Sequence, residues 1–472
     1  MKAFFCICIF ACSIFTYTSA CGQSKVEVQD LTDLESVIKQ DMKTSGAPGA
    51  AIAIVKGEKI AYEKAFGLAN SVTKRPVKTH TIFQAASVTK LLTALALLAV
   101  LEKENMDLNT EIGTSIPELT KRVSKITLHQ LLSHTSGIMD RWPNKSGCKE
   151  EVIKYFTEPG DDILFEEPGA VFSYSNNGYI LTGLVLSRLT SQSYEQAIQD
   201  LIFSPLDMNH SSFDLNHVIT GSFANGHRFY PYEKKVVPVE FALTDTRMQP
   251  AGGLFTNIHD MARLASALMN DGNLDGKQVF DKNVVSQLQT VISSLGIQHQ
   301  NFGYPKSSYS YGSINFEYRG IKFFGHTGDA YGQNALFGIA PNHDTAIIIF
   351  SNAGGYPFIH SFEKAADLFL PVKEKIVGPS FNSTNIENLV GKYYHPDIQN
   401  PKSDWIEILS RNDSLYIDIG FGGEYPLKQV GNLKYQFSHP FYLFSPEIKF
   451  IKDEKGRIKY LNSMWRIYVK SD

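Results

Sequence analysis

A serine and a lysine three residues apart, Ser87 and Lys90, are the residues of this 472-residue chain that could form a nucleophile. The segment that follows them, 91–101, consists mostly of leucine and alanine and contains no glycine, proline or charge. Because leucine and alanine are strong helix formers, this pattern predicts a buried helix with Ser87 at or near its start. Lys90 then lies one turn later on the same face. An unprotonated lysine held against a serine hydroxyl can make that oxygen nucleophilic without a histidine.

The same spacing occurs at three other serines, Ser36, Ser71 and Ser146, so the pattern alone is weak. Ser36 lies in an amphipathic stretch, 31–42, which indicates a solvated helix face. The other two serines stand among glycine, asparagine and proline residues, which indicate loops. Ser87 alone opens a buried helix, where backbone N–H groups and the helix dipole can face a reacting group.

Two further motifs could complete a site at Ser87. Tyr174 and Asn176 lie in a predicted loop that precedes an apolar helix over 178–189. His326-Thr327-Gly328 follows a predicted strand, 321–325, and has no second copy in the chain. Taken singly, the tyrosine is typical of a core aromatic residue, the histidine of a structural one and the lysine of a solvated helix residue. The three motifs in this order are far more specific than any one of them.

The composition excludes several other classes of protein. The formal net charge is −3, which gives no indication of a nucleic acid partner or an anionic membrane surface. With 43% hydrophobic and 20% charged residues, the chain is typical of a globular protein with a substantial core. No Cys/His spacing suggests a metal site, and we expect neither a metal nor a cofactor.

The first twenty residues predict export. Met1-Lys2 precedes an almost wholly apolar stretch, 3–15, which is too short to span a membrane. Small residues before Ala20 complete the pattern of a secretory signal peptide over 1–20. The residues around Cys21 resemble a bacterial lipoprotein cleavage site, after which Cys21 would carry the lipid; the alternative is plain cleavage after Ala20. We therefore expect an exported protein, periplasmic or anchored to the membrane as a lipoprotein.

Strand patterns at both ends of the region 31–370 flank a helical middle. The expected helices are 31–43, one that runs into a turn over 128–137, 178–189, 194–202, 258–269 with Asn257 as cap, and 358–370. The expected strands are 50–55, 59–67, 310–316, 318–325, 333–340 and 345–351. The economical arrangement is an α/β (α+β) fold, in which one antiparallel sheet is built from both ends and covered by helices. The helical middle then forms a second lobe, with a cleft between the lobes.

The C-terminal part predicts a separate domain. We expect one domain over 21–371, a linker over 372–385 and an all-β domain over 386–472. The expected strands of the last domain include 405–409, 414–419, 442–444 and 464–469, which alternate with period two. A small barrel or sandwich is the architecture that such short strands favour.

With these motifs, the chain resembles the serine β-lactamase and penicillin-binding protein superfamily in its class C-like branch, which includes D-alanyl-D-alanine carboxypeptidases and related esterases. The segments 132–137, 250–254 and 309–312 add to the resemblance, which covers about residues 30–371. The C-terminal domain resembles the lipocalin-like β domain appended to some members, most clearly over 387–394.

The resemblance implies a catalytic role for three residues. Ser87 would attack a carbonyl carbon and form an acyl-enzyme, with Lys90 beside it as the base. An ordinary lysine has a pKa near ~10.4, so a base at pH 7 needs a shift of about three units. Tyr174 would exchange protons with Ser87 and the leaving group, which requires its pKa to be lowered from ~10.

The substrate-binding residues that the resemblance implies are Asn176, His326, Thr327, Gly328 and Asp329. Asn176 would orient the lysine and bind the substrate amide, and His326 and Thr327 would line the far wall. The backbone N–H groups of Ser87 and Asp329 would form an oxyanion hole.

The third motif departs from the class C β-lactamase pattern, because His326 stands where lysine is usual. A histidine with an ordinary pKa near ~6.5 is charged only part of the time, so the wall suits an anionic substrate less well. The resemblance implies a small-molecule or peptide substrate: an ester, a D-amino-acid peptide or amide, or a β-lactam. The alternatives are a β-lactamase proper and a non-catalytic penicillin-binding or sensing lipoprotein.

Overall fold

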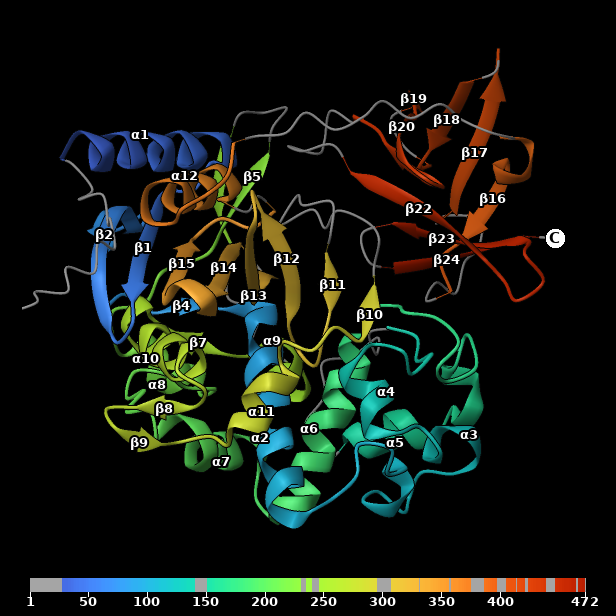
Figure 1. The fold of residues 1–472 in the computed structure, drawn as a ribbon, viewed down its shortest axis with the longest axis horizontal. Helices are drawn as coiled ribbons and strands as arrows, with labels where there is room; N and C mark the ends of the chain where they lie inside the picture. Colours follow the sequence, from blue (N-terminus) through green and yellow to red (C-terminus); the bar gives the residue numbers. More distant parts are fainter. Residues whose placement is uncertain are drawn as a thin grey trace, which may run out of the picture.

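The computed structural model describes residues 28–140, 151–230, 235–239, 246–294, 307–330, 332–355, 358–374, 386–396, 405–412, 414–420, 423–438, 446–463 and 466–471. The signal peptide, Cys21, Cys148 and most of the expected linker lie outside these residues. Within them the chain forms two large sheets with a helical lobe beneath the first (Figure 1).

The first sheet is antiparallel throughout and joins the two ends of the region. Its strand order is β10-β11-β12-β13-β14-β15-β1-β2-β3. The strands are β1 (Gly49–Lys56), β2 (Lys59–Asn70), β3 (Arg75–Pro76), β10 (Ser293–Ser294), β11 (Ser308–Tyr309), β12 (Ile314–Tyr318), β13 (Ile321–Ala330), β14 (Gln333–Ala340) and β15 (Thr345–Ser351). The first strand pairs with the last, with Ile52 opposite Ile349. The predicted sheet built from both ends is therefore confirmed.

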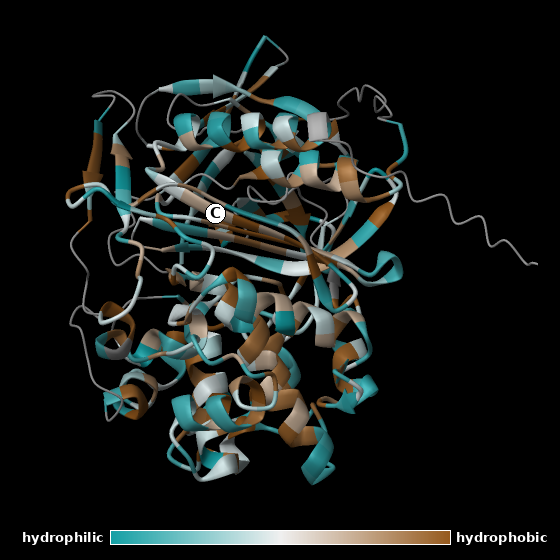
Figure 2. Ribbon diagram, turned by 90° about the vertical axis from the view of Figure 1, so that its left-hand side faces the viewer, coloured by the Kyte–Doolittle hydropathy of each residue, from teal (hydrophilic) through white to brown (hydrophobic). Residues whose placement is uncertain are grey.

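Helices cover both faces of this sheet, which explains its almost uninterrupted apolar strands. Alternate residues of β1 contribute to different cores: Ile52 packs under α1 (Val28–Ser45) and α12 (Ile359–Phe369), whereas Ala53 faces the helical lobe. Figure 2 shows the brown strands lying between a pair of helices above and the helical lobe below. The sheet is thus a rigid wall for anything at its lower face.

The helical lobe surrounds α2 (Thr89–Glu104), which is buried on nearly all sides. Its other helices are α3 (Lys121–Ser124), α4 (Leu128–Leu132), α5 (Val152–Thr157), α6 (Asn176–Thr190), α7 (Tyr194–Ile198), α8 (Leu215–Ile219), α9 (Gln249–Gly252), α10 (Ile258–Met269) and α11 (Lys282–Gln287). As predicted, the Asn257 side chain caps α10, accepting from the N–H groups of His259 and Asp260. No helix in the described residues is long and apolar enough to cross a membrane.

The shorter strands pair outside the large sheet. They are β4 (Phe83–Gln84) with β7 (Phe255–Thr256), β5 (His227–Tyr230) with β6 (Lys235–Pro238), and β8 (Asn273–Leu274) with β9 (Lys277–Gln278). The β4–β7 pair lies just before the Ser87 turn and ties it to the segment after α9.

Two predicted elements are wrong in detail. The helix predicted over 194–202 changes to a π-helical turn after Ile198, at Gln199–Phe203. The strand predicted over 310–316 begins only at Ile314, where β12 starts, and the residues between β11 and β12 form a bend. Gly312 lies in the intervening bend with φ +70°, a left-handed conformation that the strand pattern does not reveal.

The C-terminal part forms a nearly closed, barrel-like sheet with its own core. The strand order is β19-β18-β17-β16-β24-β23-β22-β21-β20. The strands are β16 (Gly391–Tyr394), β17 (Trp405–Arg411), β18 (Ser414–Asp418), β19 (Glu424–Pro426), β20 (Lys428–Gly431), β21 (Lys434–Gln436), β22 (Glu447–Lys452), β23 (Ile458–Ser463) and β24 (Arg466–Lys470). The two end strands, β19 and β20, are consecutive in the chain. The predicted all-β fold is confirmed, whereas the strand predicted over 442–444 lies outside the described residues.

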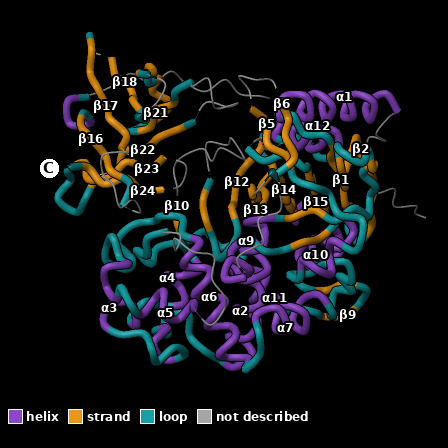
Figure 3. Tube along the Cα trace, turned by 180° about the vertical axis from the view of Figure 1, so that it is seen from behind, coloured by secondary structure: helices purple, strands orange, loops and turns teal. Residues whose placement is uncertain are grey.

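The β domain lies beside the β10 edge of the first sheet, as Figures 1 and 3 show from opposite sides. Tyr460 and Ile467 pack against Val171, which precedes α6 in the chain. The Glu166 carboxylate accepts hydrogen bonds from Lys459 Nζ at 2.6 Å and from the Tyr460 hydroxyl at 2.5 Å. The barrel is therefore docked by both apolar and charged contacts on the segment that leads to Tyr174.

Gly312 provides a test of how tightly the sheet packs on α2. A Cβ at Gly312 would come within 2.5 Å of the Lys90 carbonyl oxygen, whereas one at Gly57, also left-handed at φ +59°, would meet nothing within 4 Å. Gly57→Ala should lower the free energy of unfolding by about 1 kcal/mol through backbone strain alone. Gly312→Ala should lower it by about 2 kcal/mol more, since the backbone must move. Urea denaturation of both variants measures the difference, and equal losses would contradict this packing.

Candidate active site

Ser87 lies in a 3₁₀ turn, η1 (Ala86–Val88), that runs directly into α2. The α-helix proper begins at Thr89, so Ser87 is near the helix start, as predicted. Ala86 has φ +49°, an unfavourable conformation for a residue with a Cβ, which a surrounding structure must enforce. Part of that enforcement comes from β13, because a Cβ at Gly328 would lie 2.1 Å from the Ala85 carbonyl oxygen. The third motif thus packs directly on the turn that carries the serine.

Lys90 is completely buried and its amine has three neighbours. Nζ lies 2.7 Å from Asn176 Oδ1, 2.6 Å from the Ala251 carbonyl oxygen and 3.2 Å from Ser87 Oγ. The first two atoms can only accept, provided that the Asn176 oxygen faces the lysine. All three oxygens accept from Nζ in this arrangement, which matches the three N–H donors of an ammonium group. Burial of the amine favours loss of one proton. The neutral amine can then keep its two N–H donors on Asn176 Oδ1 and the Ala251 carbonyl oxygen, and its lone pair can accept the serine proton.

Asp140 fixes the orientation of Asn176. The Asn176 side-chain Nδ2 donates to Asp140 Oδ2 at 2.9 Å and its backbone N–H donates to Oδ1 at 2.7 Å. Because Nδ2 is committed to a carboxylate, Oδ1 must face Lys90. The carboxylate also accepts from the N–H of Asn177 at 3.1 Å, and so caps the first turn of α6. Asp140 belongs to no short motif, and the sequence analysis did not identify it.

Arg466, from β24 of the C-terminal domain, also reaches this site. Its guanidinium lies 2.5 Å from Asp140 Oδ2 and stands 5.5 Å from the centre of the Tyr174 ring. Burial lowers the pKa of the Lys90 amine well below its usual value; Asp140 opposes this shift and Arg466 favours it. Arg466 belongs to no short motif, so nothing in the sequence indicates that it lies near Lys90.

The Tyr174 hydroxyl is hydrogen-bonded to the Ser87 side chain, and the Lys90 amine lies 4.8 Å from the centre of its ring. Burial raises the pKa of the Tyr174 hydroxyl far above its usual value, although the hydrogen bond to Ser87 and the charge of Arg466 act in the opposite direction. The lowered pKa expected for Tyr174 is therefore wrong. A neutral phenol can donate a proton but is a poor base, so Lys90 is left as the base.

His326 belongs to a directional chain of hydrogen bonds behind Tyr174. His326 Nδ1 lies 2.5 Å from the Thr327 carbonyl oxygen, which can only accept, so this nitrogen carries the proton. Its Nε2 then accepts from the Tyr309 hydroxyl at 3.2 Å. The Tyr309 oxygen in turn lies 3.1 Å from His134 Nε2, and His134 Nδ1 accepts from the Ser175 N–H at 3.0 Å. Because its Nδ1 accepts, His134 is fixed as a neutral ring, and the chain is completed by a neutral His326.

The electrostatics agree with this assignment. Burial, aided by the nearby Lys90, lowers the pKa of His326 to about 3. Burial also lowers the pKa of His134 well below its usual value. The partial positive charge expected at His326 is therefore wrong, because the ring is only 2% exposed and cannot be hydrated when protonated.

The remaining predicted residues lie along β13. Thr327 is buried, and Gly328 is the point of closest approach to the Ser87 turn. The Asp329 carboxylate accepts from the Gly355 N–H, with both oxygens at 3.1 Å. The oxyanion hole formed by the N–H groups of Ser87 and Asp329 stays a prediction.

The other copies of the serine–lysine spacing do not build such a site. Ser36 lies on α1 and donates to the Thr32 carbonyl oxygen. Ser71 lies in a turn, 2.8 Å from His227 Nε2, and Ser146 lies outside the described residues. Among the described residues, no group of three or more histidine, cysteine or acidic side chains could hold a metal ion.

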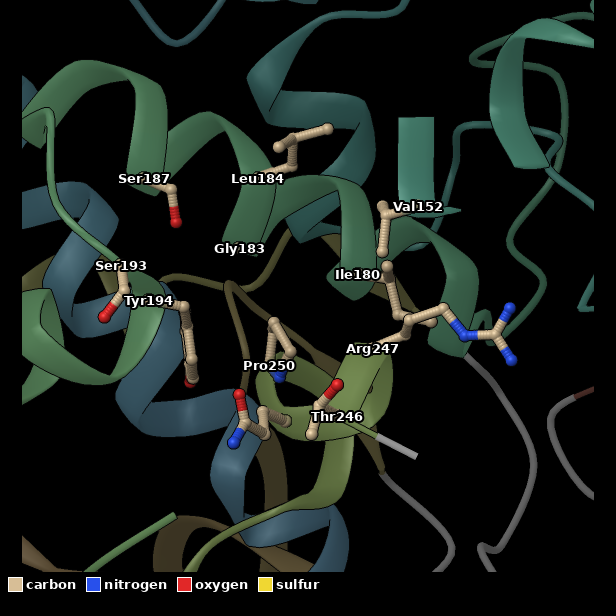
Figure 4. Close-up of a pocket in the computed structure, with 11 residues that line it drawn as sticks. Val152, Ile180, Gly183, Leu184, Ser187, Ser193, Tyr194, Thr246, Arg247 and Pro250 are labelled. Carbon is tan, nitrogen blue, oxygen red and sulfur yellow. The ribbon is translucent and has the colours of Figure 1, made fainter. Parts of the chain in front are cut away.

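A separate apolar pocket of about 220 Å³ lies between α6, α7 and α9 (Figure 4). Its lining includes Leu184, Tyr194 and Pro250, and none of the residues gathered around Ser87. It is linked to the site through the backbone, since Pro250 precedes the Ala251 carbonyl that holds Lys90.

Comparison with known proteins agrees with this arrangement. The Beta-lactamase family matches residues 34–368. Protein flp of Staphylococcus aureus (strain MRSA252) is 27% identical over 329 residues, which are 68% of this chain and 62% of that protein. The matched part of the chain thus spans less than two thirds of that relative's length.

Two solved structures share the fold. The octameric penicillin-binding protein homologue from Pyrococcus abyssi has a TM-score of 0.65 and 24% identity, covering 93% of this chain and 99% of that chain. SurE, solved with D-Leu, has a TM-score of 0.70 and 18% identity, covering 94% of this chain and 100% of that chain. Because such coverage exceeds residues 34–368, the likeness extends into the C-terminal β domain.

The His134–Tyr309–His326 chain can be tested by removing its central hydroxyl. Tyr309→Phe leaves two buried imidazole nitrogens without their partner, so we expect a loss of about 1–3 kcal/mol in the free energy of unfolding. The matched control is Tyr311→Phe, which removes the half-buried hydrogen bond to His129 at 2.7 Å and should cost less. Thermal and urea unfolding measure both variants. A smaller loss for Tyr309→Phe than for Tyr311→Phe would contradict the chain.

Proposed function

The chain belongs to the Beta-lactamase family, and on that premise we propose that it is an exported serine hydrolase that forms an acyl-enzyme at Ser87. One observation carries the proposal: the Lys90 amine is completely buried, which lowers its pKa, and lies 3.2 Å from Ser87 Oγ. When neutral, it can keep its two N–H donors on Asn176 Oδ1 and the Ala251 carbonyl oxygen and turn its lone pair to the Ser87 hydroxyl. A buried neutral amine in that position is suited to act as a general base.

In the proposed acylation step, the Ser87 proton moves to Lys90 as Oγ attacks the carbonyl carbon of the substrate. The resulting tetrahedral oxyanion would be stabilised by the backbone N–H groups of Ser87 and Asp329. Tyr174, a neutral phenol, gives its proton to the leaving group and recovers one from the Lys90 ammonium. In deacylation, Lys90 takes a proton from the attacking water, the bond between the acyl carbon and Ser87 Oγ breaks to release the acid, and the proton passes to Oγ, so the resting site is restored.

We propose esters and D-amino-acid peptides or amides as the substrate class. A neutral His326 provides no cation on the wall that the third motif forms, which favours esters and D-amino-acid amides without a carboxylate at that wall over β-lactams, which carry one there. The similar fold of SurE, solved with D-Leu, supports the choice of D-amino-acid substrates. A β-lactamase proper and a non-catalytic penicillin-binding or sensing protein are the alternatives that the experiments below separate.

We also propose that residues 1–20 direct export and that Cys21 anchors the mature protein in the membrane. The support is the sequence pattern described above. Cys21→Ala should move the protein from the membrane fraction to the soluble periplasmic fraction; an unchanged membrane fraction would contradict lipidation.

Ser87 can be tested against another serine with the same spacing to a lysine. Ser87→Ala should abolish covalent labelling by an activated ester and reduce hydrolysis of a nitrophenyl ester by about 10³-fold or more. Ser71→Ala is the matched control and should change neither, because Ser71 is bonded to His227 outside the site. Mass spectrometry of the labelled peptide identifies the modified serine. Labelling that persists in Ser87→Ala would contradict the proposal.

The same protein with three substrates separates the functional alternatives. Rates on a nitrophenyl ester, a D-Ala-D-Ala peptide and a chromogenic cephalosporin should be higher for the first two. Fast turnover of the cephalosporin identifies a β-lactamase. A lasting adduct without turnover identifies a sensor.

A further inference from the structure

We propose that Arg466 is a positioning residue of the active site, and that the C-terminal β domain completes the site by placing its guanidinium on Asp140. The inference rests on the proposed function, since it concerns the base that activates Ser87. The catalytic domain alone supplies the serine, the lysine and the tyrosine. Among the described residues, the cation paired with Asp140 comes from the β domain.

The contacts form one continuous line from the β domain to the nucleophile. Arg466 lies 2.5 Å from Asp140 Oδ2, and the same oxygen accepts from Asn176 Nδ2 at 2.9 Å. The other face of that amide, Asn176 Oδ1, accepts from Lys90 Nζ at 2.7 Å, and Nζ contacts Ser87. The Asp140 side chain is 4% exposed and that of Arg466 is 25% exposed, so the pair is weakly screened by water.

Asp140 has two opposing effects on Lys90. By accepting from Asn176 it turns the amide oxygen toward Lys90, but its negative charge favours the protonated form of the lysine. A protonated Lys90 has no lone pair for the serine proton. Arg466 offsets the charge of Asp140 while leaving its hydrogen bonds to Asn176 in place, so the orientation is retained without the electrostatic cost.

The other groups that face Lys90 do not supply this positive charge. They are the tyrosines Tyr174 and Tyr179, with ring centres 4.8 Å and 5.7 Å from Nζ, and the imidazoles of His134 and His326. Both phenols and both imidazoles are neutral near pH 7, because burial raises the pKa values of the tyrosines and lowers those of the histidines. Among the described groups that influence Lys90 electrostatically, Asp140 and Arg466 are the charged ones.

Arg466 also lies over the Tyr174 ring, 5.5 Å from its centre, and so packs against the phenol. Docking of the barrel does not depend on this arginine, since Glu166 separately binds Lys459 and Tyr460. The docking contact and the electrostatic contact can therefore be altered independently. This separation makes the proposal testable in the full-length protein.

The experiment follows the pH dependence of Ser87 acylation by a neutral nitrophenyl ester, measured as the first-order burst at saturating substrate. Acylation requires neutral Lys90, so its rate rises with pH through the pKa of that amine. Removing Arg466 leaves the charge of Asp140 unbalanced and raises that pKa. In Arg466→Met we therefore expect the acid limb to move to higher pH by about one unit, an approximately tenfold loss of rate on the acid side.

Three further variants define the cause of the shift. Arg466→Lys keeps the cation and should restore most of the wild-type profile. Arg466→Met combined with Asp140→Asn removes both charges and should return the acid limb toward its wild-type position, even where the plateau rate is lower. Glu166→Gln weakens docking without touching the Asp140 pair and should leave the position of the limb unchanged. Circular dichroism checks that each variant is folded.

The possible failures are distinguishable. If wild-type Ser87 is not acylated at all, the proposed function fails before the inference is tested. If acylation occurs but Arg466→Met leaves the acid limb in place, or Glu166→Gln shifts it equally, the electrostatic role is overturned. A change confined to KM for substrates that carry a carboxylate, absent for their methyl esters, would identify Arg466 as a substrate-binding residue and overturn the positioning role.

Discussion

The structure depends on one amine held by two oxygen atoms. Asn176 Oδ1 and the Ala251 carbonyl oxygen both accept from Lys90 Nζ, which also lies against Ser87 Oγ. Once the buried amine is neutral, these two oxygens take both of its N–H donors and leave its lone pair for Ser87. The surrounding elements can be understood through this requirement. α2 buries the amine, and α9 carries the Ala251 carbonyl. Ser175 caps α6, so that the side-chain amide of the next residue, Asn176, lies within reach of Lys90.

Burial provides the neutral amine but cannot orient its partners, so the site also needs a fixed charge. The Asp140 carboxylate supplies the orientation and would reprotonate the lysine if left alone, because opposite charges stabilise each other strongly at low dielectric. The guanidinium of Arg466 resolves this conflict from a different domain. The β domain thus contacts the active site through the charged pair of Arg466 and Asp140, as well as through the apolar contact of Ile467 with Val171.

Much of this could be predicted from the sequence, because local patterns specify it. Period and turn residues predicted the sheet built from both ends and the all-β domain, and three short motifs predicted residues that the fold brings together around Ser87. The missing residues are defined by tertiary contact. Asp140 and Arg466 lie far apart in the sequence and carry no motif, and the bend at Gly312 depends on the approach of α2. The predicted charge states are wrong for the same reason: burial raises the pKa of Tyr174, where a lowered pKa was expected, and removes the partial charge expected at His326.

With a neutral His326 and a charged Arg466, the positive charge of the site lies in a different place from that of a site with lysine at the third motif. With lysine at the third motif, the wall formed by β13 would bear a cation close to Lys90, which would lower the pKa of that amine directly. In this chain the wall is a neutral chain of His134, Tyr309 and His326, and the cation lies instead against Asp140 and over the Tyr174 ring. A site that still requires a deprotonated lysine must then obtain its compensating charge elsewhere. The docked barrel is the described element that supplies it, which gives a physical reason for two domains to act as one enzyme.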